Sequence, residues 1–321
     1  MSTHRSWRRP PHFDRSSAIR TPTRRWSSRR SVSSAGCCEA NHLARAARGT
    51  DVYHGIDFSG AARPAADIWI ASARPTDDGL RIERCASAGE RFGVTDRAAV
   101  LTALRTWLVE RDGVAGLDFS FGLPRVLVPR DARGSWSSFL RWFAAAFADS
   151  DGKAMQTDLK ERARASDSDG VELKRETDGP TGASSPYSFI TRYQTLHGVR
   201  DVLAPLVLGD RVGVEPMAPT ESGPTLCEIY PAATLRALGL PDERYKGGTH
   251  ENERPRRKEI VAGLRAWGVT MDDGLADRLI AETGGDALDS VVGTVAVARA
   301  VANGFQPESA RYDPLEGCIY A

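Results

Sequence analysis

The order of strand and helix patterns between residues 51 and 121 most constrains how this chain can fold. Three β-rich segments follow one another with short linkers, at residues 51–60, 66–75 and 80–88. Short linkers favour an antiparallel meander. Residues 95–113 then place apolar side chains on one helical face, and Thr95 or Asp96 is the candidate N-cap. The apolar segment 114–121 follows that helix, which is typical of a parallel strand at the centre of a sheet.

The remainder of the chain alternates between helical and short strand patterns. The helical patterns cover 135–149, 153–166, 186–209, 231–238, 255–267, 272–285 and 286–304, and the strand patterns cover 211–217, 225–231 and 317–321. Pro186 suits the first turn of a helix, whereas the polar segment 167–185, with Gly and Pro, predicts a surface loop. Together the patterns predict one mixed α/β domain over 51–321, with helices flanking the sheet and a helical insert at about 135–208.

Residues 1–50 differ in composition from the rest of the chain. They contain eleven Arg, no Lys and two acidic residues, a net charge of +9, whereas residues 51–321 carry a net charge of −8. This Arg- and Ser-rich tail lacks the aliphatic periodicity of a folded segment, so we expect disorder without an assigned role. A nucleic-acid-binding arm, a transit peptide and upstream sequence translated from a misplaced start remain alternatives.

Composition also bounds the compartment. The five cysteines show no CxxC pair and no metal-binding spacing, which favours free thiols in a reducing, cytoplasmic environment. No apolar run approaches the roughly 18 residues of a membrane-spanning helix, so no membrane association is expected. The strong preference for Arg over Lys, with much Ala and Asp, suggests a GC-rich prokaryotic genome. The sequence leaves the oligomeric state open.

Four carboxylates stand in apolar surroundings, and they are the candidate catalytic and metal-binding residues. They are Asp57 in "GIDFSG", Asp118 in "GLDFSFG", Glu228 in "TLCEIYP" and Asp289 in "DALDSVVGTVAVARA". An isolated buried carboxylate is costly unless something pairs with it. A divalent cation would pair with all four at once, and Mg²⁺ prefers carboxylate oxygens.

Each carboxylate also has a purely structural interpretation. Asp57 can bond to the backbone of a turn at Ser59, and Glu228 can be a core residue paired with an arginine. Asp286 lies three residues before Asp289, on the same helical face, and is either an additional metal ligand or the N-cap of the last helix.

The order of these motifs resembles the ribonuclease H-like superfold. More narrowly, the chain is similar to a prokaryotic family of unknown function described as predicted RNase H-like nucleases. The resemblance rests on "GIDFSGA", "GLDFSFGLP", "EIYPAA", "RYKGG", "DALDSVVGTVAVARA" and "EGCIYA", which together span about 55–321. It implies a βββαβ start and a site in which Asp57, Asp118 and Asp289 face Mg²⁺ or Mn²⁺, and it matches Glu228 to a strand-end Glu of the family.

The function expected from this resemblance is metal-dependent hydrolysis of phosphodiester bonds in DNA or RNA. Lys246, in a charged, Gly-containing segment, is a possible phosphate contact, or part of an ordinary solvated loop. The net charge of −8 in residues 51–321 opposes nucleic-acid binding, unless the basic tail compensates. Two alternatives stay open: a nucleotide-binding protein of the actin-like or sugar-kinase type, and a non-catalytic binding protein that keeps the fold.

Overall fold

The structure is a computed structural model that describes residues 52–247, 253–307 and 312–321, all within one compact unit. The basic tail of residues 1–50 lies outside the described residues, as does the segment 248–252 that follows Lys246 and Gly247. The predictions about the tail are therefore not addressed by the structure.

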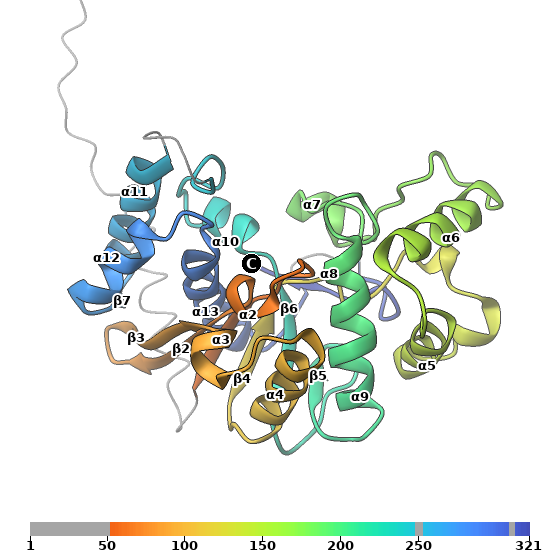
Figure 1. Ribbon diagram of the computed structural model, residues 1–321, viewed down its shortest axis with the longest axis horizontal. Helices are drawn as coiled ribbons and strands as arrows, with labels where there is room; N and C mark the ends of the chain where they lie inside the picture. Colours follow the sequence, from red (N-terminus) through yellow and green to blue (C-terminus); the bar gives the residue numbers. More distant parts are fainter. Residues whose placement is uncertain (1–51, 248–252, 308–311) are drawn as a thin grey trace, which may run out of the picture. The chain divides into compact units, whose positions relative to one another are not determined.

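The described residues form one sheet of eight strands with parallel and antiparallel pairs (Figure 1). The strands are β1 (Tyr53–Asp57), β2 (Trp69–Thr76), β3 (Gly79–Ser87), β4 (Val114–Leu117), β5 (Gly213–Glu215), β6 (Thr225–Ile229), β7 (Val269–Thr270) and β8 (Ile319–Tyr320). Their lateral order is β5-β6-β4-β1-β2-β3-β7, and β8 pairs with β6. The first three strands are an antiparallel meander, and β4 lies parallel to β1 at the centre of the sheet. Both sequence predictions about these strands are confirmed.

Helices cover both faces of the sheet, as predicted. They are α2 (Pro64–Asp67), α3 (Ala88–Phe92), α4 (Arg97–Val109), α5 (Trp136–Ala146), α6 (Gly152–Arg164), α7 (Asp178–Thr181), α8 (Arg192–His197), α9 (Ala204–Val207), α10 (Pro231–Ala237), α11 (Glu253–Ala266), α12 (Asp273–Ala281) and α13 (Asp286–Ala302), with the π-helix η3 (Gly198–Leu203) and 3-10 turns at Arg125–Leu127 and Arg130–Ala132. One apolar core joins the sheet to α4, α5, α6 and the α8–η3–α9 segment. A second core joins the opposite face to α10, α11, α12 and α13.

The segment 167–209 differs from its prediction. Residues 167–185 were expected to form a surface loop, yet Arg175 and Asp178 are buried, and α7 lies inside the segment. Helical structure was expected from Pro186 but begins at Arg192, after a turn held by hydroxyl groups. Buried ion pairs between segments far apart in sequence leave no local periodicity, which explains why a polar composition was misleading here.

Helix α13 packs unusually closely on the centre of the sheet. It contacts β1 at Gly55, where a Cβ atom would lie 2.1 Å from the carbonyl oxygen of Ser290. Gly116 on β4 stands beside Gly55 in the parallel register, and a Cβ atom there would lie 2.7 Å from Val297. Two adjacent glycines therefore form a flat seat for the helix, which has almost no exposed side chain along its length.

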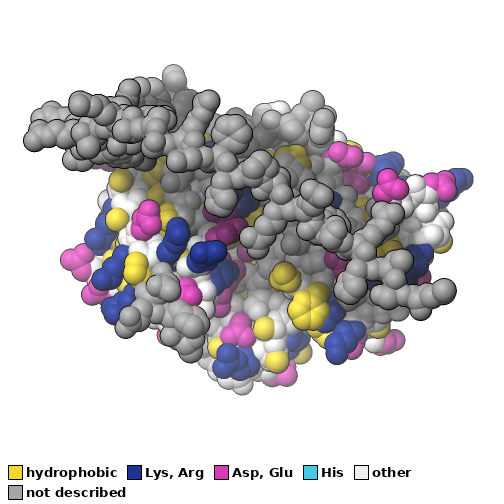
Figure 2. Space-filling view, turned by 90° about the horizontal axis from the view of Figure 1, so that it is seen from above, with side chains coloured by type: hydrophobic (Ala, Val, Ile, Leu, Met, Phe, Trp, Pro, Cys, Tyr) yellow, Lys and Arg dark blue, Asp and Glu magenta, His cyan; other side chains and the backbone are white. Residues whose placement is uncertain are grey.

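Charges of both signs are mixed on the surface. On the face drawn in Figure 2, Lys and Arg side chains lie next to Asp and Glu side chains, and the part of that face not covered in grey shows no continuous basic area. Among the residues that the structure describes, none of the helices has both the length and the apolar character needed to span a bilayer.

The close contact between Gly55 and α13 can be tested by substitution. Gly55→Ala is expected to lower the free energy of unfolding by about 1–3 kcal/mol or more, because the added methyl group overlaps backbone atoms that cannot rotate away. Urea denaturation measures the change. Gly134→Ala is the matched control, since a Cβ atom at Gly134 meets nothing within 4 Å. Equal losses in the two variants would contradict the close packing of α13.

Candidate active site

The alternation of side chains along β1 and β4 sends Asp57 and Asp118 to the same face of the sheet as α13. Side chains two residues apart in a strand share a face. Asp57 lies two residues after Gly55, and Asp118 lies two residues after Gly116, so each follows a glycine that contacts α13 or its neighbours. The repeated phrase Gly-x-Asp thus combines a seat for the helix with a carboxylate at the strand end.

Helix α13 brings two further carboxylates to this point from its first turn. Asp286 is the first residue of the helix and Asp289 follows one turn later, near the positive end of the helix dipole. Asp289 is only 2% exposed, and it accepts a hydrogen bond of 2.7 Å from the hydroxyl group of Tyr245. We name Asp57, Asp118, Asp286 and Asp289 the aspartate cluster.

The N-cap interpretation of Asp286 is wrong. The N-cap residue is Gly285, in a left-handed conformation with φ of 81°. Because glycine has no side chain, another residue must accept hydrogen bonds from the free N–H groups at the start of the helix. Glu282 has this role, because its carboxylate accepts hydrogen bonds from the backbone N–H groups of Gly284 and Ala287, at 2.5 and 3.3 Å. The Asp286 carboxylate therefore remains available to the pocket, which it lines.

Lys246 is the cation that the structure places among these acids. Its ammonium group pairs with Asp289, and its side chain is 47% exposed. Burial lowers the pKa of Lys246, but Asp289 and Asp57 outweigh burial and raise the pKa above its usual value. The backbone next to the lysine is held in place, because the buried Arg257 donates a 2.6 Å hydrogen bond to the carbonyl group of the neighbouring Tyr245.

One lysine does not neutralise four aspartates. Burial, with Asp289 and Asp286 next, raises the pKa of Asp57 well above its usual value in spite of Lys246. Burial also raises the pKa of Asp118 to about 8, with Asp289 adding to the effect and Lys246 opposing it. For Asp286 burial is again the main cause, and its pKa rises to about 6. Burial and neighbouring acids thus favour the protonated forms of Asp57 and Asp118 at neutral pH, and Lys246 opposes this only in part.

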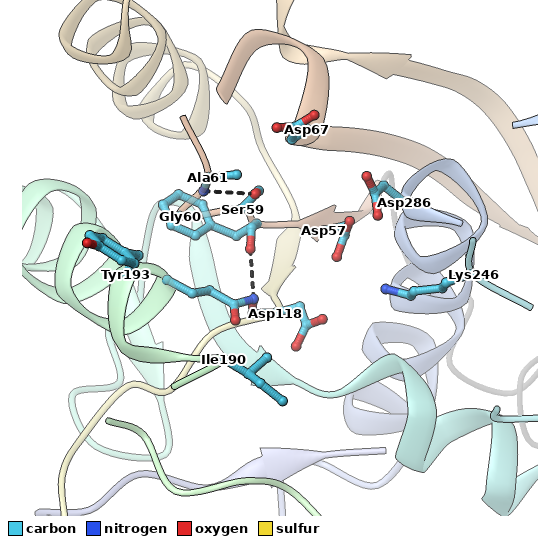
Figure 3. Close-up of a pocket in the computed structure, with 12 residues that line it drawn as sticks. Asp57, Ser59, Gly60, Ala61, Asp67, Asp118, Ile190, Tyr193, Lys246 and Asp286 are labelled. Carbon is cyan, nitrogen blue, oxygen red and sulfur yellow. Dashed lines mark hydrogen bonds between the residues drawn. The ribbon is translucent and has the colours of Figure 1, made fainter. Parts of the chain in front are cut away.

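Two pockets meet at the aspartate cluster. The main pocket has a volume of about 360 Å³, and its lining includes Asp57, Asp118, Lys246 and Asp286 (Figure 3). The second pocket, of about 340 Å³, is lined by residues of the α10 and Tyr245 region: Tyr230, Pro231, Ala232, Asp242, Glu243, Arg244 and Tyr245, together with Asp118, Lys246 and Asp289. Asp118 and Lys246 line both pockets, so both pockets border the cluster.

The helical insert forms the wall of the main pocket opposite the cluster. Figure 3 shows Tyr193 and Ile190 across the pocket from Asp57 and Asp286. Gln194 of α8 fixes this wall to the sheet, because its amide group donates to the carbonyl oxygens of Phe58, at 2.7 Å, and of Asp118. The insert therefore does more than cover the sheet, since it completes the pocket.

Glu228 belongs to a different site from the one the sequence suggested. It pairs in the sheet with Leu117, so its side chain leaves the face opposite to that of Asp118. There it is 2% exposed and receives a double hydrogen bond from Arg175, at 2.5 and 2.8 Å, and a third bond of 3.0 Å from the N–H group of Phe121. Arg175 also bonds to Asp178 and to the backbone of Glu316. The structural interpretation of Glu228, a core residue paired with arginine, describes this arrangement.

The chemistry of the donor set fits a divalent cation, although Lys246 now balances part of the charge. Carboxylate oxygens are the preferred ligands of Mg²⁺, and a doubly charged ion would favour the ionised forms of Asp57 and Asp118 against the burial and the neighbouring acids that raise their pKa values. As placed, no three Asp, Glu, His or Cys side chains in the described part of the chain converge as an ion-binding group. Metal binding would therefore require the side chains to rearrange around Lys246.

Other residues of the site carried no recognisable signal in the sequence. Tyr245, Gln194 and Arg257 act through hydrogen bonds to groups distant in the chain, and Glu282 acts through bonds to backbone groups two and five residues later. Among the basic residues that follow Lys246 in the sequence, Arg257 is buried and bonds to the backbone, whereas Arg254 and Arg256 are exposed. Only the three-dimensional arrangement distinguishes these roles.

The raised pKa of Asp118 makes a prediction about stability. The folded state holds this proton up to about pH 8, whereas the unfolded chain releases it near 3.8, so stability contributed by the protonated form is lost as pH rises between these values. Asp118→Asn should therefore melt at a higher temperature than wild type in EDTA at pH 8, with the difference shrinking towards pH 4. Thermal melts across this pH range provide the measurement. A difference that is independent of pH would contradict the assignment.

At Glu228, in contrast to Asp118, we expect removal of the carboxylate to lower the stability of the protein. Glu228→Ala leaves the buried Arg175 without one of its partners and should cost about 3–5 kcal/mol of stability. Asp158→Ala is the matched control, because it breaks the partly exposed pair with Arg162 on α6 and should cost less than about 1 kcal/mol. Chemical denaturation of both variants decides the matter: similar losses would mean that the buried pair contributes no more than a surface pair.

Comparison with known proteins adds no assignment. A search of protein-family models, of curated proteins and of solved structures found no match to this chain. A proposal about what the protein does therefore rests on the side chains and the pockets described above.

Proposed function

We propose that the protein is a metal-dependent phosphodiesterase that cuts nucleic acid, with Mg²⁺ or Mn²⁺ held by the aspartate cluster. The observation that carries the proposal is the meeting of Asp57, Asp118 and Asp289 at the ends of two central strands and the start of one helix. Asp57 and Asp118 are buried carboxyl groups with raised pKa values, and titratable groups perturbed in this way concentrate at functional sites.

The proposed RNase H-like fold rests on the arrangement of the elements. The first three strands form a meander, a helix follows, and the next strand lies parallel to β1. The carboxylates come from β1, from the end of β4 and from the last long helix, in the order that the resemblance implies. Glu228 has no part in the proposed site, because its carboxylate is committed to Arg175 on the other face.

In the proposed site, Asp57 and Asp118 would hold the cation, with Asp286 and Asp289 as further donors. Such an ion lowers the pKa of a bound water and stabilises charge on the leaving oxygen. Ion binding would require Asp57 and Asp118 to be deprotonated, and the ion itself would lower their raised pKa values. The Asp289 carboxylate is oriented by the hydroxyl group of Tyr245, which limits its rotation.

Lys246 is proposed to contact a phosphate group. Its ammonium group borders both pockets, and its long, half-exposed side chain can turn from Asp289 towards an anion. A chain-like substrate could pass from one pocket to the other beside Asp118. The mixed surface charges and the net charge of −8 in residues 51–321 leave the metal ion and Lys246 as the main attraction for phosphate.

Cleavage assays test this proposal directly. The full chain should cut labelled DNA or RNA strands in Mg²⁺ or Mn²⁺ and not in EDTA. Asp57→Asn and Asp118→Asn should each reduce the rate on the order of 100- to 1,000-fold, because each removes charge that stabilises the transition state through the cation. Calorimetric titration with Mn²⁺ should show weaker binding by the same variants.

Asp67→Asn is the matched control. Asp67 lines the same pocket but pairs with Arg63 and is not a member of the cluster, so its loss should change the rate by less than about tenfold. Undiminished cutting by both cluster variants would refute the metal site. Stabilisation of the wild-type protein by ATP, without any cutting, would favour the nucleotide-binding alternative.

A further inference from the structure

Two neighbouring large apolar side chains stand in solvent at the turn before α8, which forms a wall of the main pocket. Phe189 is 72% exposed and Ile190 is 77% exposed, and Val126 is the other exposed large apolar residue among those described. Ile190 lines the main pocket together with Asp57 and Asp118. The two apolar side chains are neighbours in the chain, and one of them reaches a polar pocket, so we ask what they could contact there.

The turn that presents these side chains is held rigidly. The hydroxyl groups of Ser188 and Thr191 bond to each other at 2.9 Å, and Thr191 donates a 2.6 Å bond to the carbonyl group of Ser185. The backbone N–H group of Arg192 bonds to the carbonyl group of Ser188 at 3.1 Å, which closes the turn. The exposure of Phe189 and Ile190 is therefore built into the turn and does not result from local unfolding.

Phe189 is also supported by a buried cation. The guanidinium group of Arg192 lies 4.8 Å from the centre of the Phe189 ring. Arg192 in turn bonds to the side chain of Gln156 at 2.6 Å, and Gln156 bonds to the backbone of Tyr187 at 2.9 Å. An aromatic ring supported by a fixed guanidinium group forms a flat platform that needs little ordering when a planar ligand arrives.

The platform and the aspartate cluster are parts of one rigid arrangement. The turn leads directly into α8, whose Gln194 bonds to the carbonyl groups at the ends of β1 and β4. These are the strand ends that carry Asp57 and Asp118. A ligand group stacked on Phe189 would thus be held at a fixed position relative to the ends of β1 and β4.

We propose that Phe189, flanked by Ile190, is a stacking platform for an unpaired base of the strand that is cut, so that the enzyme prefers single-stranded nucleic acid. The inference rests on the proposed function and names its substrate class. Every base has a π-face, and base stacking on an aromatic side chain contributes about 1–3 kcal/mol. In a duplex the bases already stack on one another, and their faces are not available to a protein ring.

The size of the platform favours a base over a second protein. A phenylalanine side chain buries about 150–250 Å² when it is covered. A stable protein interface needs about 800 Å² from each partner, which two side chains do not provide. A single planar ring of a nucleobase matches the area that Phe189 and Ile190 offer.

The test compares two single strands of equal length, an oligothymidylate and the same phosphodiester chain without bases. In Mn²⁺, Phe189→Ala should raise KM for the oligothymidylate roughly 5- to 150-fold, the range that one lost stacking contact implies. Phe189→Trp keeps an aromatic face and should show a KM for the oligothymidylate close to that of wild type. On the chain without bases, wild type and Phe189→Ala should give the same KM, because that chain has nothing to stack. Val126→Ala, at the exposed apolar residue that lines another pocket, should leave both substrates unaffected.

The outcomes below would overturn either the stacking platform at Phe189 or the proposed nuclease function. Equal KM values of wild type and Phe189→Ala for the oligothymidylate, or equal cutting of the strand and its duplex, would overturn the platform. Association of wild type into dimers that Phe189→Ala abolishes, measured by sedimentation equilibrium, would assign the surface to a second copy instead. If wild type cuts nothing, the proposed function fails. Fluorescence anisotropy of the same two strands on Asp57→Asn/Asp118→Asn, with and without Phe189→Ala, then decides the platform independently of cutting.

Discussion

The close contact between α13 and the centre of the sheet is the constraint on which the candidate site depends. Gly55 and Gly116 leave room for the helix backbone, and that approach carries Asp286 and Asp289 to the ends of β1 and β4. Larger residues at either glycine would lift the helix and separate its acids from those of the strands. The packing of an apolar helix thus determines the distance between polar groups, which links the core of the protein directly to its chemistry.

The same packing makes ionisation of the carboxyl groups in the aspartate cluster unfavourable. Burial and mutual repulsion raise the pKa values of Asp57 and Asp118, while Lys246 offsets only part of the effect. A protein selected only for stability would replace such residues by neutral ones. The buried carboxyl groups, the two adjoining pockets and the exposed ring of Phe189 are the features on which the proposed site for a cation and an anionic polymer rests.

The sequence predicted the meander from its short linkers and the central parallel strand from the helix that precedes it, and both are confirmed. It also singled out Asp57, Asp118 and Asp289 as carboxylates in apolar surroundings, and each of them lines at least one of the two described pockets. It did not predict the separation of Glu228 from these residues. Which face a strand residue occupies depends on its register with the neighbouring strand, and Glu228 stands beside Leu117 rather than beside Gly116. The hydrogen bonds of Gln194 and Tyr245 were also beyond prediction, since each joins segments far apart in the chain.

The Arg175 site has a consequence for how the molecule opens. Its guanidinium group joins the segment before α7 to β6 and to the backbone near the end of the chain. Moving the insert away from the sheet would separate Arg175 from Glu228 and leave that buried carboxylate without its arginine, because Asp178, the other partner of Arg175, belongs to the insert. The insert and the sheet should therefore behave as one cooperative unit in hydrogen exchange, with no partly open state in which the pocket wall detaches alone. A substrate would then enter a pocket whose walls are already in place.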